Sequence, residues 1–405
     1  MFDYTSYKDV DLKGKKILMR VDINSNIDVE NNRIRESPRI HTLIPALKEL
    51  KDCAVVIMAH QSRPGKKDFT SLELHANEIR KLLDRPVKYV DDIFGEKAVQ
   101  AIKELKVGEV LVLDNVRKWE PENKKYKDFK EAEQLEMIQT LAPLFDYFIA
   151  DAFGAAHRAQ PSIIGWPTLI AGPTTVKELQ YMEKVLENPE RPMVMLIGGA
   201  KAIDKYKAMK YNFESGRLDH ALCSGLTAIL IMEAIGIPTG EPNKESVAKD
   251  LEEAKDDIKE TYEKFKDKIV LPKDLVIEEN GNRKVVEIDD LAKYNAVTGD
   301  IGPKTMEEFT NIMMKAKTII ANGPPGIFEK EVFREGTFKM AEVMARATKE
   351  NGALTIIGGG EMGTAAEMSG YAKDVSFIST GGGAMLEILS GKDVPMVKAL
   401  REKKP

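Results

Sequence analysis

The sequence predicts an α/β protein in which the sheets are mostly parallel. Short apolar runs of about four to six residues, rich in β-branched side chains, recur along the whole chain. They lack polar alternation, which suits strands that are covered on both faces. Longer mixed segments separate the runs. This order is typical of parallel sheets flanked by helices, in the manner of Rossmann-like folds.

Nine apolar runs are expected to form strands, and one segment is the clearest helix. Residues 246–265 place Val247, Leu251 and Ile258 on one stripe of an otherwise charged helix. We interpret this segment as a surface helix packed on a sheet, with a partner-binding helix as the alternative. The expected strands are Lys16–Val21, Ala54–Ala59, Glu109–Leu113, Tyr147–Ala150, Met193–Ile197, Lys268–Leu271, Thr318–Ala321, Ala353–Ile357 and Val375–Ile378.

The length of 405 residues predicts two or three domains. The best boundary lies between Gly172 and Pro192, where GPTTVKELQYMEKVLENPERP reads as a loop, one helix and a proline-bounded exit. We therefore expect a first domain of residues 1–175, a connecting helix within 176–190 and a second domain of residues 191–390.

The composition excludes several classes of protein. A net charge of -5 argues against a nucleic-acid binder or a membrane-surface protein. No apolar run approaches the roughly 18 residues of a membrane span. The only cysteines are Cys53 and Cys223, so neither a disulfide framework nor a cysteine metal site is expected. The N-terminal stretch also lacks the apolar core of a signal peptide, and we expect a cytoplasmic protein.

Cationic and polar side chains follow each of the first four expected strands. In open parallel sheets, ligands bind beyond the carboxyl ends of the strands. Arginine suits phosphate and carboxylate groups, and Asp or Asn can bind hydroxyls. We expect a small, hydroxylated, strongly anionic ligand, and scattered surface arginines are the alternative. These residues are Arg20, Asp22, Asn24, His60, Arg63, Asp114, Asn115, Arg117, Asp151, His157 and Arg158, with Arg39 near a helix start.

Glycine-rich turns follow four strands of the second half. Glycine lets backbone N–H groups approach phosphate oxygens, and a following helix adds its positive end. Four such turns indicate a polyphosphate and hence a nucleotide. Lys201 and Lys205 are four residues apart, so on a helix opening at Ala200 they would share one face toward the phosphates. Solvated lysines are the alternative, more so for Lys205 than for Lys201. The turns begin at Gly198, Asn322, Gly358 and Thr380.

One glycine pattern favours a different enzyme class. Gly358, Gly360 and Gly363 fit GxGxxG directly after a strand, as in dinucleotide-binding folds. Such a site also needs an acidic residue at the end of the next strand, but this one ends in Ser379-Thr380-Gly381. No Walker A pattern is present either. The two halves together indicate a phosphotransferase that closes on an anion and a nucleotide.

The chain resembles the phosphoglycerate kinase family nearly from end to end. The matching motifs stand in the family's order as RVDIN, HQSRP, DNVR, DAFGAAHRA, GPTTVKEL, ERPMVMLIGGAK, DIGP, ANGPPGIFE, IGGG and STGGGAMLEIL. The HQSRP and DAFGAAHRA variants are more similar to archaeal members. The resemblance also implies that residues 391–405 return to pack on the first domain, and that the connecting helix acts as a hinge.

The resemblance assigns residues to two ligands. Arg39, Lys201, Gly360 and Gly383 match the catalytic positions that face the transferring phosphoryl group. Asp22, Asn24, Arg39, His60, Arg63, Arg117 and Arg158 match the 3-phosphoglycerate site. Gly199, Lys201, Lys205, Gly225, Gly302, Asn322, Pro324, Gly326, Ile327, Glu329, Gly358, Gly359, Gly360, Glu361 and Met362 match the nucleotide site.

The resemblance implies reversible phosphoryl transfer between 1,3-bisphosphoglycerate with ADP and 3-phosphoglycerate with ATP, in glycolysis and gluconeogenesis. Mg²⁺ is the implied cofactor, and a monomer or homodimer is implied. The main departure is Glu361-Met362, which stands where the family has Asp-Thr. We expect Glu361 to approach the metal. A non-catalytic relative that only binds these ligands is the alternative, and a nicotinamide-dependent enzyme is a more distant one.

Overall fold

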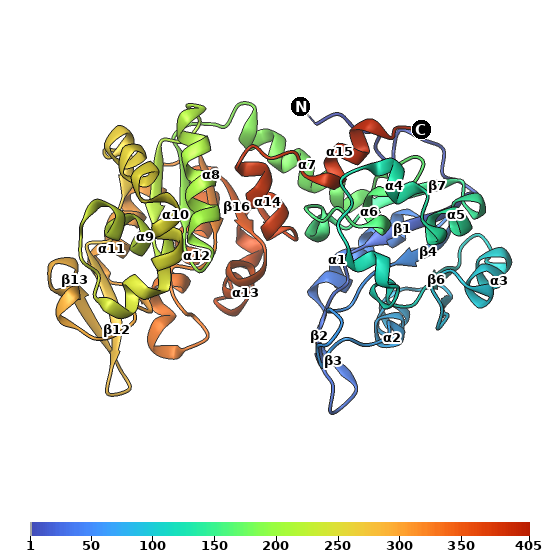
Figure 1. Ribbon diagram of the computed structural model, residues 1–405, viewed down its shortest axis with the longest axis horizontal. Coiled ribbons are helices and arrows are strands. Elements are labelled where there is room, and N and C mark those ends of the chain that lie inside the picture. Colours follow the sequence, from blue (N-terminus) through green and yellow to red (C-terminus); the bar gives the residue numbers. More distant parts are fainter. Residues whose placement is uncertain (1) are drawn as a thin grey trace. The chain divides into compact units, whose positions relative to one another are not determined.

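The computed structural model describes residues 2–405, apart from the side chain of Glu36. The chain divides into two compact units, and each is built around its own parallel sheet (Figure 1). Unit 1 comprises Met1–Tyr181 and Asp393–Pro405, and unit 2 comprises Met182–Lys392. The predicted fold class, with two parallel-sheet α/β domains flanked by helices, is confirmed.

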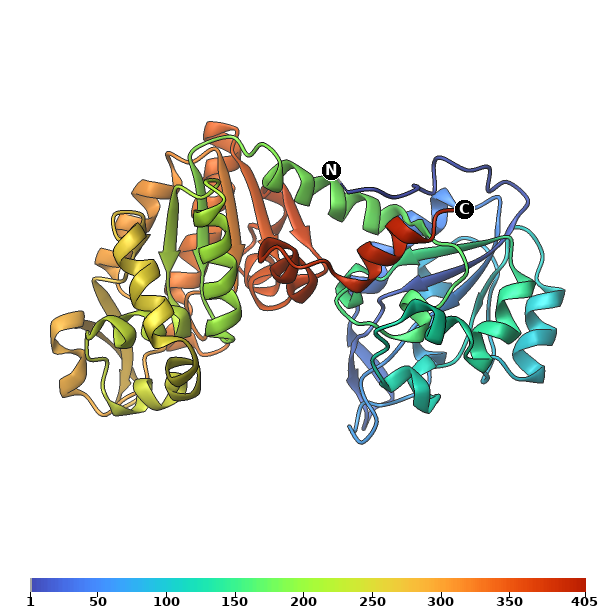
Figure 2. The ribbon, with the colours of Figure 1, turned by 45° about the horizontal axis from the view of Figure 1, so that its top comes forward.

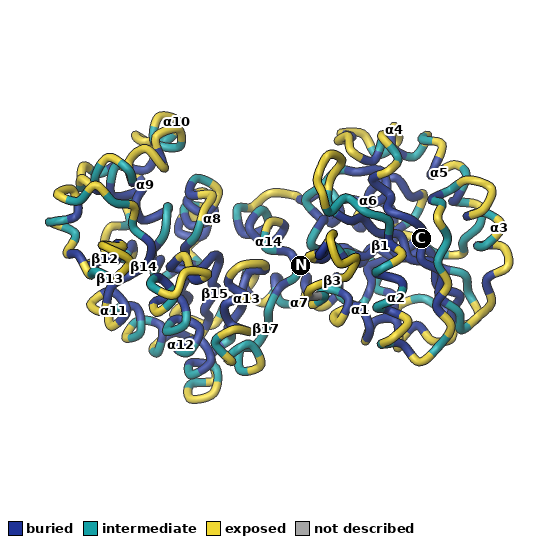
Figure 3. Tube along the Cα trace, turned by 90° about the horizontal axis from the view of Figure 1, so that it is seen from below, coloured by how far each residue is buried: buried dark blue, intermediate teal, exposed yellow. Residues whose placement is uncertain are grey.

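The sheet of unit 1 has six strands in the order β5-β6-β4-β1-β7-β8, and all its pairings are parallel. Its central strands are almost completely buried (Figure 3), as expected for apolar runs covered by helices on both faces. The strands are β1 (Lys16–Val21), β4 (Ala54–Met58), β5 (Val87–Tyr89), β6 (Val110–Val112), β7 (Tyr147–Asp151) and β8 (Ile170–Ala171), with a separate hairpin of β2 (Asn26–Asp28) and β3 (Arg33–Glu36).

Helices cover this sheet and follow its strands in the chain. The first helix, α1, begins at Pro38, where a proline is favoured because its missing N–H has no partner in the helix anyway. The others are α2 (Glu73–Leu82), α3 (Glu96–Glu104), α4 (Phe129–Glu133), α5 (Glu136–Leu141), α6 (Pro161–Ile164) and α15 (Pro395–Glu402), and α1 itself runs over Pro38–Glu49.

The sheet of unit 2 repeats this architecture in the order β11-β10-β9-β15-β16-β17, again with parallel pairings. A separate small antiparallel sheet, β13-β12-β14, is formed by strands that lie between β11 and β15 in the sequence. The strands are β9 (Met193–Ile197), β10 (His220–Cys223), β11 (Ile269–Val270), β12 (Asp274–Glu279), β13 (Asn282–Glu287), β14 (Asp300–Ile301), β15 (Thr318–Asn322), β16 (Leu354–Gly358) and β17 (Phe377–Ser379).

Most helices of unit 2 begin directly after a strand or a glycine, whereas α12 follows the short helix η6 (Glu331–Phe333). Among them α9 is buried along most of its length because its sequence is apolar on nearly every side. The helices are α8 (Ala202–Glu214), α9 (Gly225–Ile235), α10 (Glu241–Phe265), α11 (Pro303–Met313), α12 (Glu335–Asn351), α13 (Gly360–Met368) and α14 (Gly382–Leu389).

Two segments connect the units along the chain. Helix α7 (Pro173–Leu186) contributes residues to both units, because the division falls after Tyr181. Helix α15 belongs to unit 1 although it follows all of unit 2 in the sequence, and Figure 2 shows it beside the blue and green elements of unit 1. Lys403 anchors it there, since its Nζ donates to the carbonyls of Ile164 at 2.7 Å and Trp166 at 2.9 Å.

The nine expected strands are all present, with ends that differ by at most two residues. The expected helix 246–265 is correct in type but begins five residues early, at Glu241. The prediction was wrong there because the first turns are polar, and Pro242 was not recognised as a tolerated first-turn proline. The strands that the sequence analysis missed are β2, β3, β5, β8, β10, β12, β13 and β14.

Candidate functional site

The first predicted site lies at the carboxyl ends of the strands of unit 1. β1 pairs with β4 and β7 in parallel, so the residues that follow these three strands meet at one edge of the sheet. Asp22 follows β1, His60 follows β4 and Arg158 follows β7. Arg117 lies on the short helix η1 (Val116–Lys118), after β6. The sheet topology therefore brings residues from four separate segments to one rim.

Hydrogen bonds join these residues. Arg39 Nη1 donates to Asp22 Oδ1 at 2.8 Å, which holds a partly exposed guanidinium against a mostly buried carboxylate. Asn24 Oδ1 accepts from the backbone N–H of Ser62 at 2.6 Å, and Arg117 Nη1 donates to the carbonyl oxygen of the same residue. Ser62 has a φ of 56°, a strained value for a residue other than glycine. Such strain is retained where the surroundings hold the backbone in place, and the hydrogen bonds of Asn24 and Arg117 with Ser62 do so here.

Positive charge dominates this rim. Burial lowers the pKa of the Arg158 guanidinium; Asp22 opposes this effect, whereas Arg63 and Arg39 add to it. Burial, together with nearby guanidinium groups, also holds the pKa of His60 well below its usual value. Its imidazole is therefore neutral near pH 7. An arrangement of several arginines around one carboxylate favours a ligand with several negative charges.

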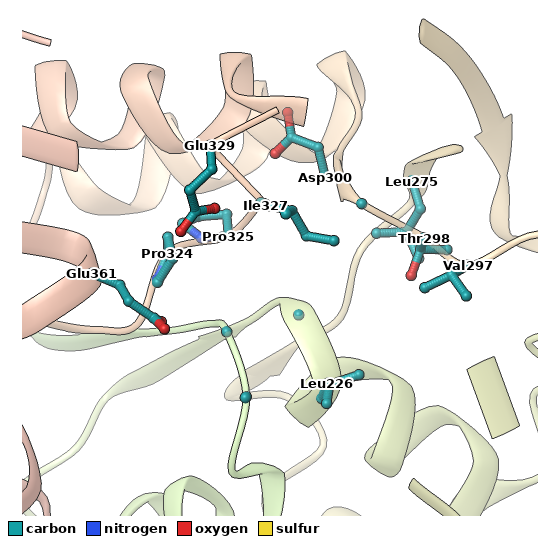
Figure 4. Close-up of a pocket in the computed structure, with 15 residues that line it drawn as sticks. Leu226, Leu275, Val297, Thr298, Asp300, Pro324, Pro325, Ile327, Glu329 and Glu361 are labelled. Atoms are coloured by element: carbon teal, nitrogen blue, oxygen red, sulfur yellow. The ribbon is translucent and has the colours of Figure 1, made fainter. Parts of the chain in front are cut away.

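The second predicted site is a cavity in unit 2 of about 330 Å³ (Figure 4). In Figure 4 the carboxylates of Glu329 and Glu361 lie on one side, and Leu226, Leu275 and Val297 lie on the other. This division suits a ligand that has a flat apolar part, hydroxyl groups and an anionic tail. The lining residues are Gly199, Ala200, Gly225, Leu226, Leu275, Val297, Thr298, Gly299, Asp300, Pro324, Pro325, Gly326, Ile327, Glu329 and Glu361.

The glycine turns of unit 2 pack tightly against one another. A Cβ atom on Gly323, which has a φ of +80°, would lie 2.2 Å from the carbonyl oxygen of Gly198. A Cβ on Gly359, which has a φ of +54°, would lie 2.5 Å from the backbone nitrogen of Gly382. Both positions exclude a side chain. The turns after β9 and β15, and those after β16 and β17, are therefore adjacent pairs.

Two lysines lie near the carboxylate side of this cavity, in different settings. Lys205 is buried and its Nζ donates to the carbonyl oxygen of Gly198, whereas Lys201 is exposed. Burial lowers the pKa of Lys205 to about 8; Glu361 opposes this shift and Lys201 adds to it. The alternative of a solvated Lys205 is therefore wrong.

The expected helix opening at Ala200 is also wrong, because α8 begins at Ala202. Lys201 is the N-cap residue, with a left-handed φ of 60° and ψ of 53°. The two lysines therefore do not share a helical face. The glycine turn continues one residue further than the sequence pattern indicated.

The remaining nucleotide-site residues lie around the cavity rather than in its lining. Gly358 ends β16, Gly359 is the N-cap of α13, and Gly360 and Glu361 are the first two residues of that helix. Asn322 ends β15 beside Gly358, since a Cβ on Gly358 would lie 2.7 Å from Asn322 Nδ2. Gly302 is the N-cap of α11, and Met362 is fully buried in α13. Neither Gly302 nor Met362 is among the lining residues of the described cavity.

The sequence analysis missed the apolar wall of this cavity. Leu275 lies on β12, one of the antiparallel strands that were not predicted, and Val297 and Thr298 precede β14. A usable signal was present: Asn280-Gly281 joins β12 to β13, with φ values of 52° and 79°. An Asn-Gly pair between two apolar stretches is the strongest short-range sign of a hairpin.

Asp300 was missed as well. Its carboxylate accepts from Arg283 Nη1 at 2.9 Å and from the backbone N–H of Gly336 at 2.8 Å. Burial raises the pKa of Asp300 to about 6, although both donors oppose the shift. The residue stands in the DIGP motif, where only the glycine had been assigned.

Glu361 is the candidate ligand for a metal. A Cβ on Gly199 would lie 3.5 Å from Glu361 Oε2 and 3.3 Å from Lys205 Nζ, so the carboxylate faces the glycine turn after β9. No cluster of three or more His, Cys, Asp or Glu side chains suited to a metal occurs among the described residues. One carboxylate at the phosphate end nevertheless fits Mg²⁺, which is usually held by one or two carboxylates together with substrate phosphates and waters.

An arginine-rich anion site on one α/β unit and a glycine-lined cavity on another are together typical of phosphotransferases. The family model for phosphoglycerate kinase matches residues 7–392. Two curated relatives are the phosphoglycerate kinases of Methanothermus fervidus, 38% identical over 99% of this chain and 98% of the relative, and of Methanococcus maripaludis, 40% identical over 98% of each. The chain therefore belongs to the phosphoglycerate kinase family.

Solved structures agree with this assignment. The crystal structure of phosphoglycerate kinase from Pyrococcus horikoshii OT3 matches with a TM-score of 0.89 and 32% identity, over 98% of each chain. The structure of the Coxiella burnetii enzyme matches with a TM-score of 0.79 and 29% identity, over 99% of this chain and 100% of the other. The chain is thus a kinase with a carboxyl group as its acceptor. Within residues 2–405, no helix has the length and apolar character needed to cross a bilayer.

Proposed function

We propose that this chain catalyses the reversible transfer of a phosphoryl group between 1,3-bisphosphoglycerate with ADP and 3-phosphoglycerate with ATP, in glycolysis and gluconeogenesis. The observation that carries the proposal is the joint presence of the arginine-rich rim in unit 1 and the glycine-lined cavity in unit 2, in a chain that matches the family over nearly its full length. A relative that binds only the nucleotide or only the phosphoglycerate would not need both.

The rim of unit 1 would bind 3-phosphoglycerate. Its triose carries a phosphate, a carboxylate and a hydroxyl group, and the rim offers guanidinium groups for the two anions. Asp22, held by Arg39, and Asn24 would take the hydroxyl. The other members of this binding set are His60, Arg63, Arg117 and Arg158.

The cavity of unit 2 would bind ATP or ADP. The apolar wall of Leu226, Leu275 and Val297 suits the adenine ring, and Glu329 suits the ribose hydroxyls. Gly199, Lys201 and Lys205 would hold the phosphates, since buried or constrained cations next to open backbone amides favour polyphosphate. Cys223 and Ser224 replace a glycine run of the family, and they precede Gly225 in the cavity lining.

The chemistry requires positioning and charge neutralisation rather than a general base. A carboxylate is already a nucleophile, and an acyl phosphate already has a good leaving group. Gly360 and Gly383 lie in the first turns of α13 and α14, so their amides belong to the positive ends of two helices. Those amides, Arg39 and Lys201 would stabilise the charge on the phosphoryl group during in-line transfer.

Mg²⁺ would be held by Glu361 together with the nucleotide phosphates. When bound, it neutralises phosphate charge and helps to orient the transferring group. Glu361 lies at the phosphate end of the cavity, close to Lys205, which supports this assignment. We further propose that the protein is a monomer or homodimer, and light scattering coupled to size exclusion would decide between the two. We propose a cytoplasmic location, which is consistent with two buried free cysteines.

The deciding experiment is phosphorus NMR, or hydroxylamine trapping of acyl phosphate, on purified protein with MgATP and 3-phosphoglycerate. We expect acyl phosphate to form with the natural chain and to be absent with Lys201→Ala. Binding of both ligands without any product would instead support the non-catalytic alternative, and would make the Glu361-Met362 departure the first suspect.

A further inference from the structure

The ring of His60 has an unusual partner. Its Nδ1 lies 3.0 Å from Nη2 of Arg20, which is on β1 and is 3% exposed. An arginine has only N–H donors, so the imidazole nitrogen that faces it must be the acceptor. Histidine rings in functional sites are more often oriented by an acceptor, such as a carboxylate or a backbone carbonyl, which places the hydrogen on the facing nitrogen.

The partner determines which nitrogen carries the hydrogen. Burial and the charged groups Arg20, Arg158 and Arg39, together with His75, lower the pKa of His60 well below its usual value. The ring is therefore neutral near pH 7 and has a single N–H group. Because Nδ1 accepts from Arg20, that hydrogen lies on Nε2. Among the described residues, Arg20 is the hydrogen-bond partner that the structure records for this ring.

We propose that Arg20 is a positioning residue that fixes His60 as the Nε2–H tautomer, and that Ser162 and Glu122 hold Arg20 in the orientation that this requires. The inference rests on the proposed function only for its ligand: the Nε2–H group would donate to an anionic oxygen of 3-phosphoglycerate. It would do so as a neutral donor, so the arginines of the rim supply the positive charge and the ring supplies direction.

A buried chain of hydrogen bonds fixes Arg20. Its Nε donates to Ser162 Oγ at 2.7 Å, and Ser162 Oγ lies 2.6 Å from Glu122 Oε1. The polarity of the chain is set by its two ends, because a guanidinium can only donate and a carboxylate can only accept. The Ser162 hydroxyl must therefore accept from Arg20 and donate to Glu122. The backbone N–H of Ser162 adds a bond to Glu122 Oε2 at 3.0 Å.

This chain of hydrogen bonds has few alternative arrangements. Glu122 and Ser162 are both fully buried, and Glu122 Oε1 lies 4.0 Å from Arg20 Nη2. Rotation of the guanidinium away from His60 would leave buried polar groups without partners, which is costly. Arg20 Nη1 also donates to the carbonyl oxygen of Val21. Each of the three guanidinium nitrogens thus has a partner, and His60 is the one that belongs to the substrate rim.

The direct test is long-range ¹H–¹⁵N NMR of the ligand-free full chain with ¹⁵N-labelled histidine. We expect Nε2 of His60 to be protonated and Nδ1 to be unprotonated near pH 7. His75 is an internal reference, since its Nε2 lies 3.0 Å from Gln61 Oε1 in the same unit, without contact to Arg20. Protonation of Nδ1, or averaging between the two tautomers, in the natural chain would overturn the proposal.

Variants of Arg20 and Ser162 test the chain of hydrogen bonds. In Arg20→Gln and Ser162→Ala we expect His60 to populate both tautomers, while the His75 signals stay unchanged. A ring without its hydrogen on Nε2 would not donate to the substrate. We expect the loss of that hydrogen bond to raise KM for 3-phosphoglycerate roughly tenfold and to leave KM for ATP unaltered. Ser162→Ala removes only one hydroxyl, and it serves if the arginine variant does not fold. An unchanged His60 tautomer in folded Arg20→Gln would show that Arg20 has a merely structural role, and an unchanged tautomer in Ser162→Ala would show that Ser162 does not hold Arg20 in place.

These readouts separate the inference from the proposed reaction. The tautomer is measured without substrate or turnover, so it can be correct even if no acyl phosphate is ever formed. Conversely, an active enzyme in which His60 carries its hydrogen on Nδ1 would leave the proposed function standing and would refute the role of Arg20.

Discussion

At the scale of single residues, burial decides how charge is used in this molecule. Lys201 and Lys205 stand four positions apart in one glycine-rich segment, yet one is exposed and the other is buried against Gly198. The sequence pattern identified both lysines, but it favoured Lys205 over Lys201 as the solvated one, and the structure shows the reverse. Their difference depends on the left-handed backbone at Lys201 and on the turn after β15, which is brought close by the sheet and is distant in the chain.

The affinity for nucleotide should depend on pH through Lys205. Burial lowers its pKa to about 8, so the ammonium loses its proton above that pH, and attraction for the phosphates weakens. We expect KM for ATP to rise as the pH increases through 8. Lys205→Arg keeps its charge in this range and should remove the dependence. Steady-state kinetics of both proteins would show this, and parallel profiles would assign the pH effect to another group.

Glu361 should set the requirement for Mg²⁺. Glu361→Ala removes the carboxylate at the phosphate end of the cavity, whereas Glu361→Asp keeps a carboxylate one methylene shorter. We expect the alanine variant to need at least about tenfold more Mg²⁺ for half-maximal activity, since even the loss of an outer partner typically weakens metal binding by that amount. Activity would be titrated with Mg²⁺ at fixed ATP. Superimposable curves for the natural chain and Glu361→Ala would remove this residue from the metal site.

At the scale of elements, most strands of the parallel sheets were predicted, whereas the antiparallel sheet was missed although Asn280-Gly281 marks its hairpin. A run such as Met193–Ile197 is apolar on both faces, and this pattern needs no tertiary information. The short strand His220–Cys223 gave no comparable signal, because it has no β-branched residue. The glycine turns of unit 2 were therefore visible in the sequence, whereas the apolar wall of its cavity includes Leu275 on β12, a strand that was missed.

The adjacent glycine turns should tolerate no side chain. Gly359 combines a φ of +54° and a ψ of -178°, a conformation nearly restricted to glycine, with a close approach to Gly382. We expect Gly359→Ala to lower the free energy of unfolding of unit 2 by about 3 kcal/mol. Gly352 is the matched control, since it also has a positive φ but no atom within 4 Å of an added Cβ. Gly352→Ala should cost only about 1 kcal/mol.

Calorimetry of the two glycine variants would measure this difference. Equal destabilisation by both substitutions would mean that backbone conformation alone, rather than the contact between the two turns, makes Gly359 necessary.

At the scale of the whole molecule, unit 1 is completed by the end of the chain. Lys403 is 7% exposed; its Nζ donates to the two carbonyls of the 164–166 turn and forms an ion pair with Glu133 at 2.6 Å. The carbonyl oxygen of Lys403 also accepts from the backbone N–H of Leu169 at 2.7 Å. The return of this segment followed from the family resemblance. The residue that anchors it could not be inferred, because its partners lie far away in the sequence.

Removal of this anchor should destabilise unit 1. Lys403→Ala leaves two buried carbonyl oxygens and a carboxylate without their donor, and we expect a loss of about 3 kcal/mol. Lys398→Ala, on α15 just before Lys403, is the control, because its pair with Glu402 is exposed and should contribute less than about 0.5 kcal/mol. Thermal unfolding of both variants would be compared. Similar midpoints would show that the apolar face of α15, rather than Lys403, holds the segment.

We also expect the two units to move relative to each other when substrates bind. α7 and the segment before α15 are the covalent links between them, and closure would exclude water from the transferring phosphoryl group. Small-angle scattering of the natural chain should change with both substrates together, and less with either one alone. Identical profiles under all conditions would argue against hinge closure.

The connectivity of unit 1 has a consequence for biosynthesis. Because residues 182–392 stand between Tyr181, within α7, and the final segment, the ribosome must finish unit 2 before it can deliver the last pieces of unit 1. The usual order, in which the N-terminal domain folds first during synthesis, would then be reversed in this protein. Until the last segment is synthesised, part of the apolar surface of unit 1 would stay uncovered. We therefore expect chaperones to bind most strongly to nascent chains arrested after unit 2 and before the last segment.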